Sequence, residues 1–251
     1  MSNSKEVIKD RYAKALEKAT EGEGSSCCPP QEAKETEEST CCGSTTDSER
    51  EVSMPSFGST QNLADKADIK EGDIVVDFGS GPGYDLLSAA KLVGPLGMAI
   101  GIDFTPDMVE YATKKAEEMG LDNVTVYQGD IEDIPLEDGI ADVIISNCVI
   151  NLAMDKQAVF NEAYRILKPG GRLVDADIIA GEELPDSLKK DKDALCGCIG
   201  GALTEKGYVD KIKKAGFKDI KVNIENSNPL NWKDKIIPMH SGIITATKPN
   251  D

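Results

Sequence analysis

Hydrophobic and polar positions change their spacing repeatedly between residue 69 and the end of the chain. Short apolar runs rich in β-branched residues are typical of buried strands, and longer amphipathic stretches with helical spacing lie between them. Predicted strands occupy residues 73–79, 97–104, 123–130, 141–147, 172–179, 220–225 and 242–248. Predicted helices occupy residues 5–19, 84–94, 105–120, 155–171 and 204–217.

Local signals mark the ends of several predicted helices. Thr105 can cap the helix that follows it, Pro106 suits the first turn, and Gly120 can end the helix. The Pro-Gly-Gly sequence at 169–171 is expected to stop another helix, and Gly216 to end the last one.

Strands that alternate with helices are typical of a parallel sheet covered on both faces. The last two predicted strands have no helix between them, so we expect an antiparallel edge. The sequence therefore predicts a doubly wound, mostly parallel α/β domain over residues 55–251. Residues 1–54 are expected to form a helix and a flexible cysteine-rich arm, because residues 20–53 carry too few large apolar side chains to offset the entropy of ordering them.

The charge of the chain limits its expected partners. It carries 28 Lys and Arg against 45 Asp and Glu, a formal net charge of −17. Such a surface repels nucleic acid and anionic membranes, so neither is expected as a partner. No apolar run is long enough to span a bilayer, and the N-terminal residues lack a signal-peptide core, so the protein is predicted to be cytoplasmic. Its seven cysteines are then expected to be thiols, and its one histidine excludes a His-rich zinc site.

A glycine loop, "VVDFGSGPGYD", follows the first predicted strand. Gly79, Gly81 and Gly83 allow a sharp turn and close approach of a ligand. The third glycine comes one residue too early for a dinucleotide fingerprint, and there is no Walker lysine. Asp77 beside the loop would also repel phosphates. The loop is therefore a poor cradle for pyrophosphate.

Acidic residues end the next two predicted strands. Asp103 can accept hydrogen bonds from both hydroxyls of a ribose, and Asp130 from an adenine amino group. Ile131 can pack on the adenine ring. A glycine loop followed by these two acids suits a nucleoside that carries a cationic sulfonium group.

These motifs resemble the class I S-adenosylmethionine-dependent methyltransferases. "VVDFGSGPG", "GIDFTPDM", "GDIEDIPL" and "LKPGG" match that family's motifs in order and spacing over about residues 70–180. The resemblance implies a Rossmann-like, seven-stranded sheet and S-adenosylmethionine as the cofactor. The residues expected to bind it are Asp77, Gly79, Ser80, Gly81, Gly83, Asp103, Phe104, Asp130, Ile131 and Asn147.

Cysteines flank the expected crevice between the carboxyl ends of the first and fourth strands. Cys148 follows the fourth strand directly, and Cys196 and Cys198 lie in "ALCGCIGGAL" after the fifth. Thiolates select soft metals and metalloids. Trivalent arsenic bound by sulfur keeps a lone pair, which could attack the sulfonium methyl group without a general base.

"SNCVINL", "CIGGAL", the N-terminal "SSCC" and "VIKDRYAKAL" resemble the arsenite S-adenosylmethionine methyltransferases. The resemblance implies that Cys148 and Cys198 are the catalytic residues and the ligands of arsenic(III). It implies a reaction that oxidises arsenic as it is methylated, with thioredoxin or a small-thiol reductant as partner. Arsenite or its thiol conjugates would be the substrate.

Family members often carry a further cysteine where this chain has Ser59. A serine hydroxyl is a poor ligand for a soft metalloid, so the third sulfur must come from elsewhere, or the site uses two. The arm offers four cysteines as third or delivery ligands, namely Cys27, Cys28, Cys41 and Cys42. A flexible arm could capture arsenite by thiol exchange and pass it inward.

Two other functions fit the same residues. The protein could methylate a small organic acceptor such as a quinone precursor, with the cysteines purely structural. It could instead be a non-catalytic, thiol-based binder of a metalloid or metal. Turnover of S-adenosylmethionine with arsenite separates the three hypotheses.

Overall fold

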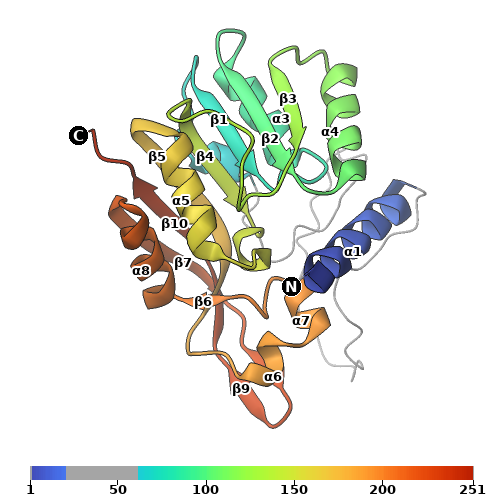
Figure 1. The fold of residues 1–251 in the computed structure, drawn as a ribbon, viewed down its shortest axis with the longest axis vertical. Helices are drawn as coiled ribbons and strands as arrows, with labels where there is room; N and C mark the ends of the chain where they lie inside the picture. Colours follow the sequence, from blue (N-terminus) through green and yellow to red (C-terminus); the bar gives the residue numbers. More distant parts are fainter. Residues whose placement is uncertain (1, 21–61, 251) are drawn as a thin grey trace.

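The computed structural model describes residues 2–20 and 62–250, and its centre is one twisted sheet with helices on both faces (Figure 1). The strands follow one another across the sheet in the order β3-β2-β1-β4-β5-β10-β7. Their bounds are β1 Ile74–Phe78, β2 Met98–Asp103, β3 Val124–Gln128, β4 Ala141–Asn147, β5 Leu167–Ala180, β7 Lys218–Ser227 and β10 Met239–Thr247. The short β6 (Leu203–Thr204) pairs with β5.

The strand directions agree with the predicted architecture. Strands β1 to β5 pair in parallel, whereas β10 runs antiparallel to both β5 and β7. The order reverses between β1 and β4, and in sheets of this kind ligands bind in the crevice at that point, outside the carboxyl ends of the strands. A doubly wound, mostly parallel sheet with an antiparallel edge is therefore confirmed.

Helices cover the two faces of the sheet and connect its strands. Their bounds are α1 Ser2–Thr20, α2 Leu63–Lys66, α3 Tyr84–Val93, α4 Pro106–Glu118, α5 Lys156–Ile166, α6 Asp186–Lys189, α7 Lys192–Cys196 and α8 Glu205–Ala215, with a 3₁₀ turn η1 at Ile150–Leu152. Within the described ranges, no helix is both long enough and apolar enough to span a bilayer.

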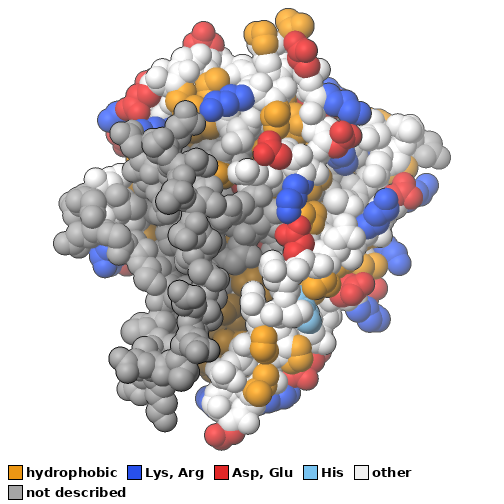
Figure 2. All heavy atoms as spheres, turned by 180° about the vertical axis from the view of Figure 1, so that it is seen from behind, with side chains coloured by type: hydrophobic (Ala, Val, Ile, Leu, Met, Phe, Trp, Pro, Cys, Tyr) orange, Lys and Arg blue, Asp and Glu red, His pale blue; other side chains and the backbone are white. Residues whose placement is uncertain are grey.

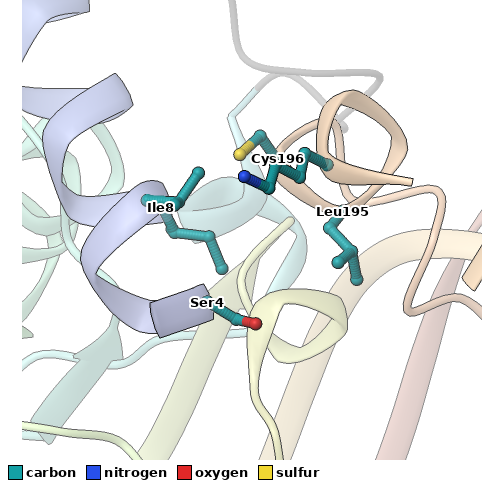
Figure 3. A pocket seen from close by; sticks show the side chains of 6 residues that line it. Ser4, Ile8, Leu195 and Cys196 are labelled. Carbon is teal, nitrogen blue, oxygen red and sulfur yellow. The ribbon is translucent and has the colours of Figure 1, made fainter. Parts of the chain in front are cut away.

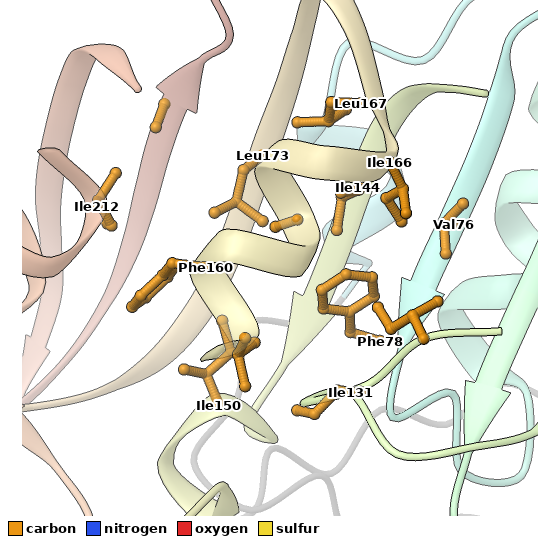
Figure 4. Packing of buried hydrophobic residues seen from close by; sticks show 14 of the residues in the cluster. Val76, Phe78, Ile131, Ile144, Ile150, Phe160, Ile166, Leu167, Leu173 and Ile212 are labelled. Carbon is orange, nitrogen blue, oxygen red and sulfur yellow. The ribbon is translucent and has the colours of Figure 1, made fainter. Parts of the chain in front are cut away.

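Alternating residues of the central strands build two hydrophobic layers. Val76 and Phe78 of β1 pack with Ile144 of β4 and with Phe160 and Ile166 of α5 (Figure 4). The intervening residues of β1 and β4 face α3 in a second cluster on the other side. Because both faces are buried, the strands are apolar almost throughout, as the sequence pattern indicated.

Two details of the predicted helices are wrong. The helix expected to continue to Pro-Gly-Gly ends at Ile166, and residues 169–171 belong to β5. There, Gly170 N donates a hydrogen bond to Lys248 O, so pairing at the chain's last strand decides the local structure. Thr105 occupies the N-cap position of α4, but its side chain makes no capping hydrogen bond. Gly216 does end α8, with a φ of 111°.

Three structural features were not predicted. Helices α6 and α7 fill the connection between β5 and β6. A separate hairpin of β8 (Leu230–Trp232) and β9 (Lys235–Ile237) follows β7. Helix α1 lies beside α7 (Figure 1), where Arg11 Nη1 donates to Asp193 Oδ1 at 2.7 Å. The domain boundary at residue 54 lies outside the described residues and stays a prediction.

The charged side chains are distributed without a basic stripe on the face shown in Figure 2. Lys and Arg side chains there are interspersed with Asp and Glu. Ion pairs near the surface of the described residues include Lys66 with Glu225 and Lys235 with Glu182. Mixed charge of this kind supports solubility more than it directs binding.

Candidate active site

The glycine loop of residues 79–83 connects β1 to α3 at the carboxyl edge of the sheet. Gly79 N and Ser80 N both donate to Ile102 O of β2, at 2.8 and 3.1 Å. Gly79, Gly81 and Gly83 have φ values of 65°, 50° and 96°, which L-residues rarely adopt. The turn is therefore specified by glycine and held against the neighbouring strand.

Of these three glycines, only Gly81 has open space where a Cβ atom would lie. A Cβ atom at Gly81 would find no atom nearer than Gly79 O, at 3.9 Å. A Cβ at Gly79 would lie 2.7 Å from Val149 Cβ, so this glycine is required by packing. The Ser80 side chain also faces inward, since a Cβ at Gly101 of β2 would lie 2.7 Å from Ser80 Oγ. A ligand can therefore approach the loop backbone at Gly81.

Three buried carboxyl groups surround the loop. Asp103 ends β2, and its two carboxylate oxygens accept hydrogen bonds from Gly81 N and Thr105 N, both at 2.9 Å. Burial raises the pKa of Asp77, as do the nearby charges of Asp85 and Asp103. Adding phosphate here would bring negative charge against negative charge, whereas a cation would stabilise the ionised carboxyls.

Asp85 is a site residue that the sequence did not single out. It lies in the first turn of α3, and Asn147 Nδ2 at the end of β4 donates to Asp85 Oδ2 at 2.7 Å. Burial raises the pKa of Asp85, while the hydrogen bond from Asn147 lowers it. An acid two positions after the last loop glycine was the only sequence signal for this link.

The residues expected at adenine lie at the end of β3, next to α1. Lys5 of α1 forms ion pairs with Asp130 and Glu132, at 2.5 and 3.0 Å. Ile131 between them is buried in the main hydrophobic cluster. The helix therefore reaches across the edge of the sheet to the acid that was expected to recognise an adenine amino group.

Cys148 and Cys198 meet at the carboxyl edge of the sheet, although 50 residues separate them in the chain. The Cys198 thiol donates to Cys148 O at 2.8 Å, and both residues are buried. Their φ values are 57° and 61°, an uncommon conformation for non-glycine residues that clusters at functional sites. The hydrogen bond with Cys198 and burial raise the pKa of Cys148, so this thiol keeps its proton at neutral pH.

Residues of α1 cover these thiols. Ile8 is buried against Cys148 and Cys198, and Tyr12 packs against the same cluster. Phe104, at the end of β2, also contacts it. Tyr12 was not predicted to have a role, because no local motif shows that α1 folds back over a site formed by residues more than 130 positions away.

A buried polar network fixes the segment that follows Cys148. Asn151 of η1 donates to both oxygens of Asp177, from its backbone N at 3.0 Å and from Nδ2 at 2.7 Å. The Tyr208 hydroxyl of α8 donates to Asn151 Oδ1 at 2.7 Å. Burial raises the pKa of Asp177 to about 7. The network holds η1, and with it Val149 and Cys148, against β5.

The arm cysteines and Ser59 lie outside the described residues, so their predicted roles stay predictions. Tyr84, which follows the glycine loop, is half exposed and donates to Asn62 Oδ1 at 2.8 Å. The structure thus brings together the glycine loop, Asp103, Asn147 and the two central cysteines at one edge of the sheet.

A family model described as a methyltransferase domain matches residues 69–235. The arsenite methyltransferase of Halobacterium salinarum is 40% identical over 151 residues, which are 60% of this chain and 39% of that protein. The arsenite methyltransferase of Aquipseudomonas alcaligenes is 36% identical over 221 residues, 85% of this chain and 62% of that protein.

Among solved structures, this chain is similar to CrArsM, an arsenic(III) S-adenosylmethionine methyltransferase from Chlamydomonas reinhardtii. The two share 35% sequence identity with a TM-score of 0.64, over 73% of this chain and 65% of that one. The chain therefore spans less than two thirds of the length of each of these relatives.

Proposed function

The chain belongs to the methyltransferase domain family, and from this premise we propose that it transfers a methyl group from S-adenosylmethionine to trivalent arsenic. The observation that carries the proposal is the meeting of Cys148 and Cys198 beside the glycine loop. Two buried thiols at the crevice of a methyltransferase fold provide soft ligands where an acceptor must sit. The similarity to arsenite methyltransferases supports the same substrate.

The residues at the loop fit this cofactor. S-adenosylmethionine supplies a methyl group on a positively charged sulfur atom. The open side of Gly81 leaves room for its methionine part, and the buried carboxyls of Asp77 and Asp103 suit a cation and ribose hydroxyls. Asp130 and Ile131 would hold the adenine, whereas Phe104 lies against the cysteines and Asn147 donates to Asp85. Ser80 would contribute only its backbone, because its side chain faces β2.

Cys148 and Cys198 hold the arsenic by thiol exchange. Each As–OH bond is replaced by an As–S bond, and each thiol proton leaves with the hydroxyl group as water. This exchange consumes the protons that the buried thiols retain at neutral pH, so no general base is needed. The arsenic keeps its lone pair, which is the nucleophile for the methyl group.

Helix α1 excludes water from this acceptor. Ile8 and Tyr12 cover the thiols, and Lys5 fixes the start of the helix to Asp130 and Glu132. A dry site protects As–S bonds from hydrolysis and strengthens the attraction between the acceptor and a cationic methyl donor.

Methyl transfer uses the arsenic lone pair and raises arsenic from the +3 to the +5 oxidation state. Two electrons from a pair of thiols return it to +3, and those thiols become a disulfide. We propose thioredoxin or a small thiol as the reductant that reduces the disulfide again. The four arm cysteines are proposed to capture arsenite and deliver it to Cys148 and Cys198.

The test is an assay of the purified full-length chain with labelled S-adenosylmethionine, a thiol reductant and a panel of acceptors. We expect label in methylated arsenicals when arsenite is present, and none in quinone precursors or small organic acids. Label in an organic acceptor but not in arsenic would show that the substrate is that organic molecule and not arsenite. Binding of arsenite without any turnover would indicate a binder instead of an enzyme.

A further inference from the structure

A third thiol lies beside the two that hold arsenic in the proposed function. Cys196 is the last residue of α7, two positions before Cys198. It is buried in the same cluster as Cys148 and Cys198, and these three side chains are here called the thiol cluster. The sequence placed Cys196 near the site but gave it no role.

Cys196 differs from the other two thiols in what it faces. It lines a small pocket between α1 and α7 together with Ile8 and Leu195. Figure 3 shows its sulfur turned toward α1. The Cys198 thiol instead points inward and donates to Cys148 O. Cys196 therefore borders the pocket between α1 and α7, whereas the Cys198 thiol is turned toward the backbone of Cys148.

Tyr12 of α1 lies next to the whole thiol cluster. Its hydroxyl donates to Cys196 O at 3.5 Å, and its ring packs against the cluster. Burial, and after it the nearby thiols of Cys198, Cys148 and Cys196, raise the pKa of Tyr12. Tyr12 thus packs against the cluster that contains all three cysteines, which lie together at one place in the fold.

We propose that Cys196 is the third sulfur ligand of trivalent arsenic, completing the site of Cys148 and Cys198; this assignment rests on the proposed function. Trivalent arsenic forms three bonds, and soft thiolates are preferred over oxygen for all of them. Arsenous acid and three thiols give one tris-thiolate complex and three waters, with no change in oxidation state. The arsenic lone pair remains available for the methyl group.

The thiol cluster must close around the arsenic. Within residues 2–20 and 62–250, no three cysteine, histidine or acidic side chains are already arranged to hold a metal ion. A cysteine redirects its sulfur by rotating about one bond. Cys198 gives up its hydrogen bond to Cys148 O, and Gly197 between the two cysteines is the non-helical end of α7. Cys196, the last residue of the short helix α7, can therefore turn its sulfur toward the arsenic.

Cys196 can supply the third sulfur ligand of arsenic that Ser59 cannot provide. Ser59 stands where the resemblance leads us to expect a cysteine, so a site with three sulfurs takes the third one from another position. Cys196 provides one from within the folded site. The competing source is the arm with Cys27, Cys28, Cys41 and Cys42, and the experiment must separate the two.

The experiment uses the full-length chain with the four arm cysteines replaced by serine, and a second variant that adds Cys196→Ser. Both are loaded with arsenite under a phosphine reductant, which brings no competing thiol, and X-ray absorption counts the sulfur neighbours of arsenic. We expect three sulfurs in the first variant and two sulfurs with one oxygen in the second. Arsenite affinity is expected to fall about tenfold or more in the second.

Phenylarsine oxide is the matched control probe, because carbon occupies one arsenic bond and two remain for thiols. We expect it to bind both variants equally, and to lose binding to the second variant once Cys148→Ser is added, because only one thiol then remains. Two sulfurs already in the first variant, or equal arsenite affinity in both, would overturn the role of Cys196 and leave the proposed function intact. Failure of phenylarsine oxide to bind the first variant would overturn the proposed arsenic site itself. Cys196→Ala provides the same comparison if serine disturbs folding.

Discussion

Replacing Gly79 by alanine tests how tightly the glycine loop is coupled to the segment that carries Cys148. The new Cβ would lie 2.7 Å from Val149 Cβ and 3.0 Å from Val149 Cγ1. Rotation of the valine side chain cannot relieve the first contact, because Cβ does not move about that bond. The backbone after Cys148 must therefore shift, and overpacking of this kind costs about 1–3 kcal/mol.

Gly139→Ala is the matched control. Gly139 has the same φ of 65° as Gly79, but a Cβ there meets nothing within 4 Å. Both variants share the cost of a left-handed alanine, about 1–2 kcal/mol, and the same loss of freedom in the unfolded chain. The difference between their unfolding free energies therefore isolates the contact with Val149.

Urea denaturation of the two variants and the parent chain gives this difference, provided that the m-value is unchanged. We expect Gly79→Ala to be less stable than Gly139→Ala by about 1–3 kcal/mol and to lose methyl transfer, while Gly139→Ala keeps it. Val149→Gly should restore part of the stability of Gly79→Ala. Equal stability of the two alanine variants would refute the reasoning.

Three further predictions follow from buried polar groups. Asp103→Ala removes the acceptor of two backbone N–H bonds, so we expect calorimetry to show S-adenosylmethionine binding weakened by about 1.5–3 kcal/mol, with phenylarsine oxide binding unchanged as the control. Tyr208→Phe leaves Asn151 Oδ1 without its donor and should lower the unfolding free energy by about 1–3 kcal/mol; an unchanged value would contradict this. Burial, and then the charge of Asp177, raise the pKa of Asp175, so the folded state binds more protons than the unfolded state and stability falls as the pH rises above about 4. Asp175→Asn should flatten that fall in denaturation curves measured between about pH 4 and pH 7, and an equally steep fall would contradict the assignment.

Features specified by neighbouring residues could be predicted from the sequence. The β-branched runs formed strands, and the glycines of the loop took the left-handed conformations that their spacing indicated. Gly216 ended its helix because its φ of 111° is open to glycine. The order of the motifs also placed Asp103 and Cys148 at the same edge of the sheet, since parallel strands end together.

Features that depend on contacts between distant parts of the chain could not be predicted from the sequence. Pro-Gly-Gly looked like a helix stop, but Gly170 N donates to Lys248 O and Lys248 N donates to Gly171 O, which makes it part of a strand. The place of α1 over the site depends on Tyr12 and on the pairing of Lys5 with Asp130, 125 residues away. Such contacts leave no local pattern, so the contacts of Tyr12, Asp85 and Cys196 became visible only in the folded chain.

The central claim is that Cys148 and Cys198 present trivalent arsenic to the methyl donor. Its most direct test is a single-turnover measurement of labelled methyl transfer to arsenite by the parent chain, Cys148→Ser and Cys198→Ser, each saturated with S-adenosylmethionine and checked for cofactor binding. We predict methylated arsenic from the parent and none from either variant, with cofactor binding retained in all three. Undiminished transfer by either serine variant would contradict the account.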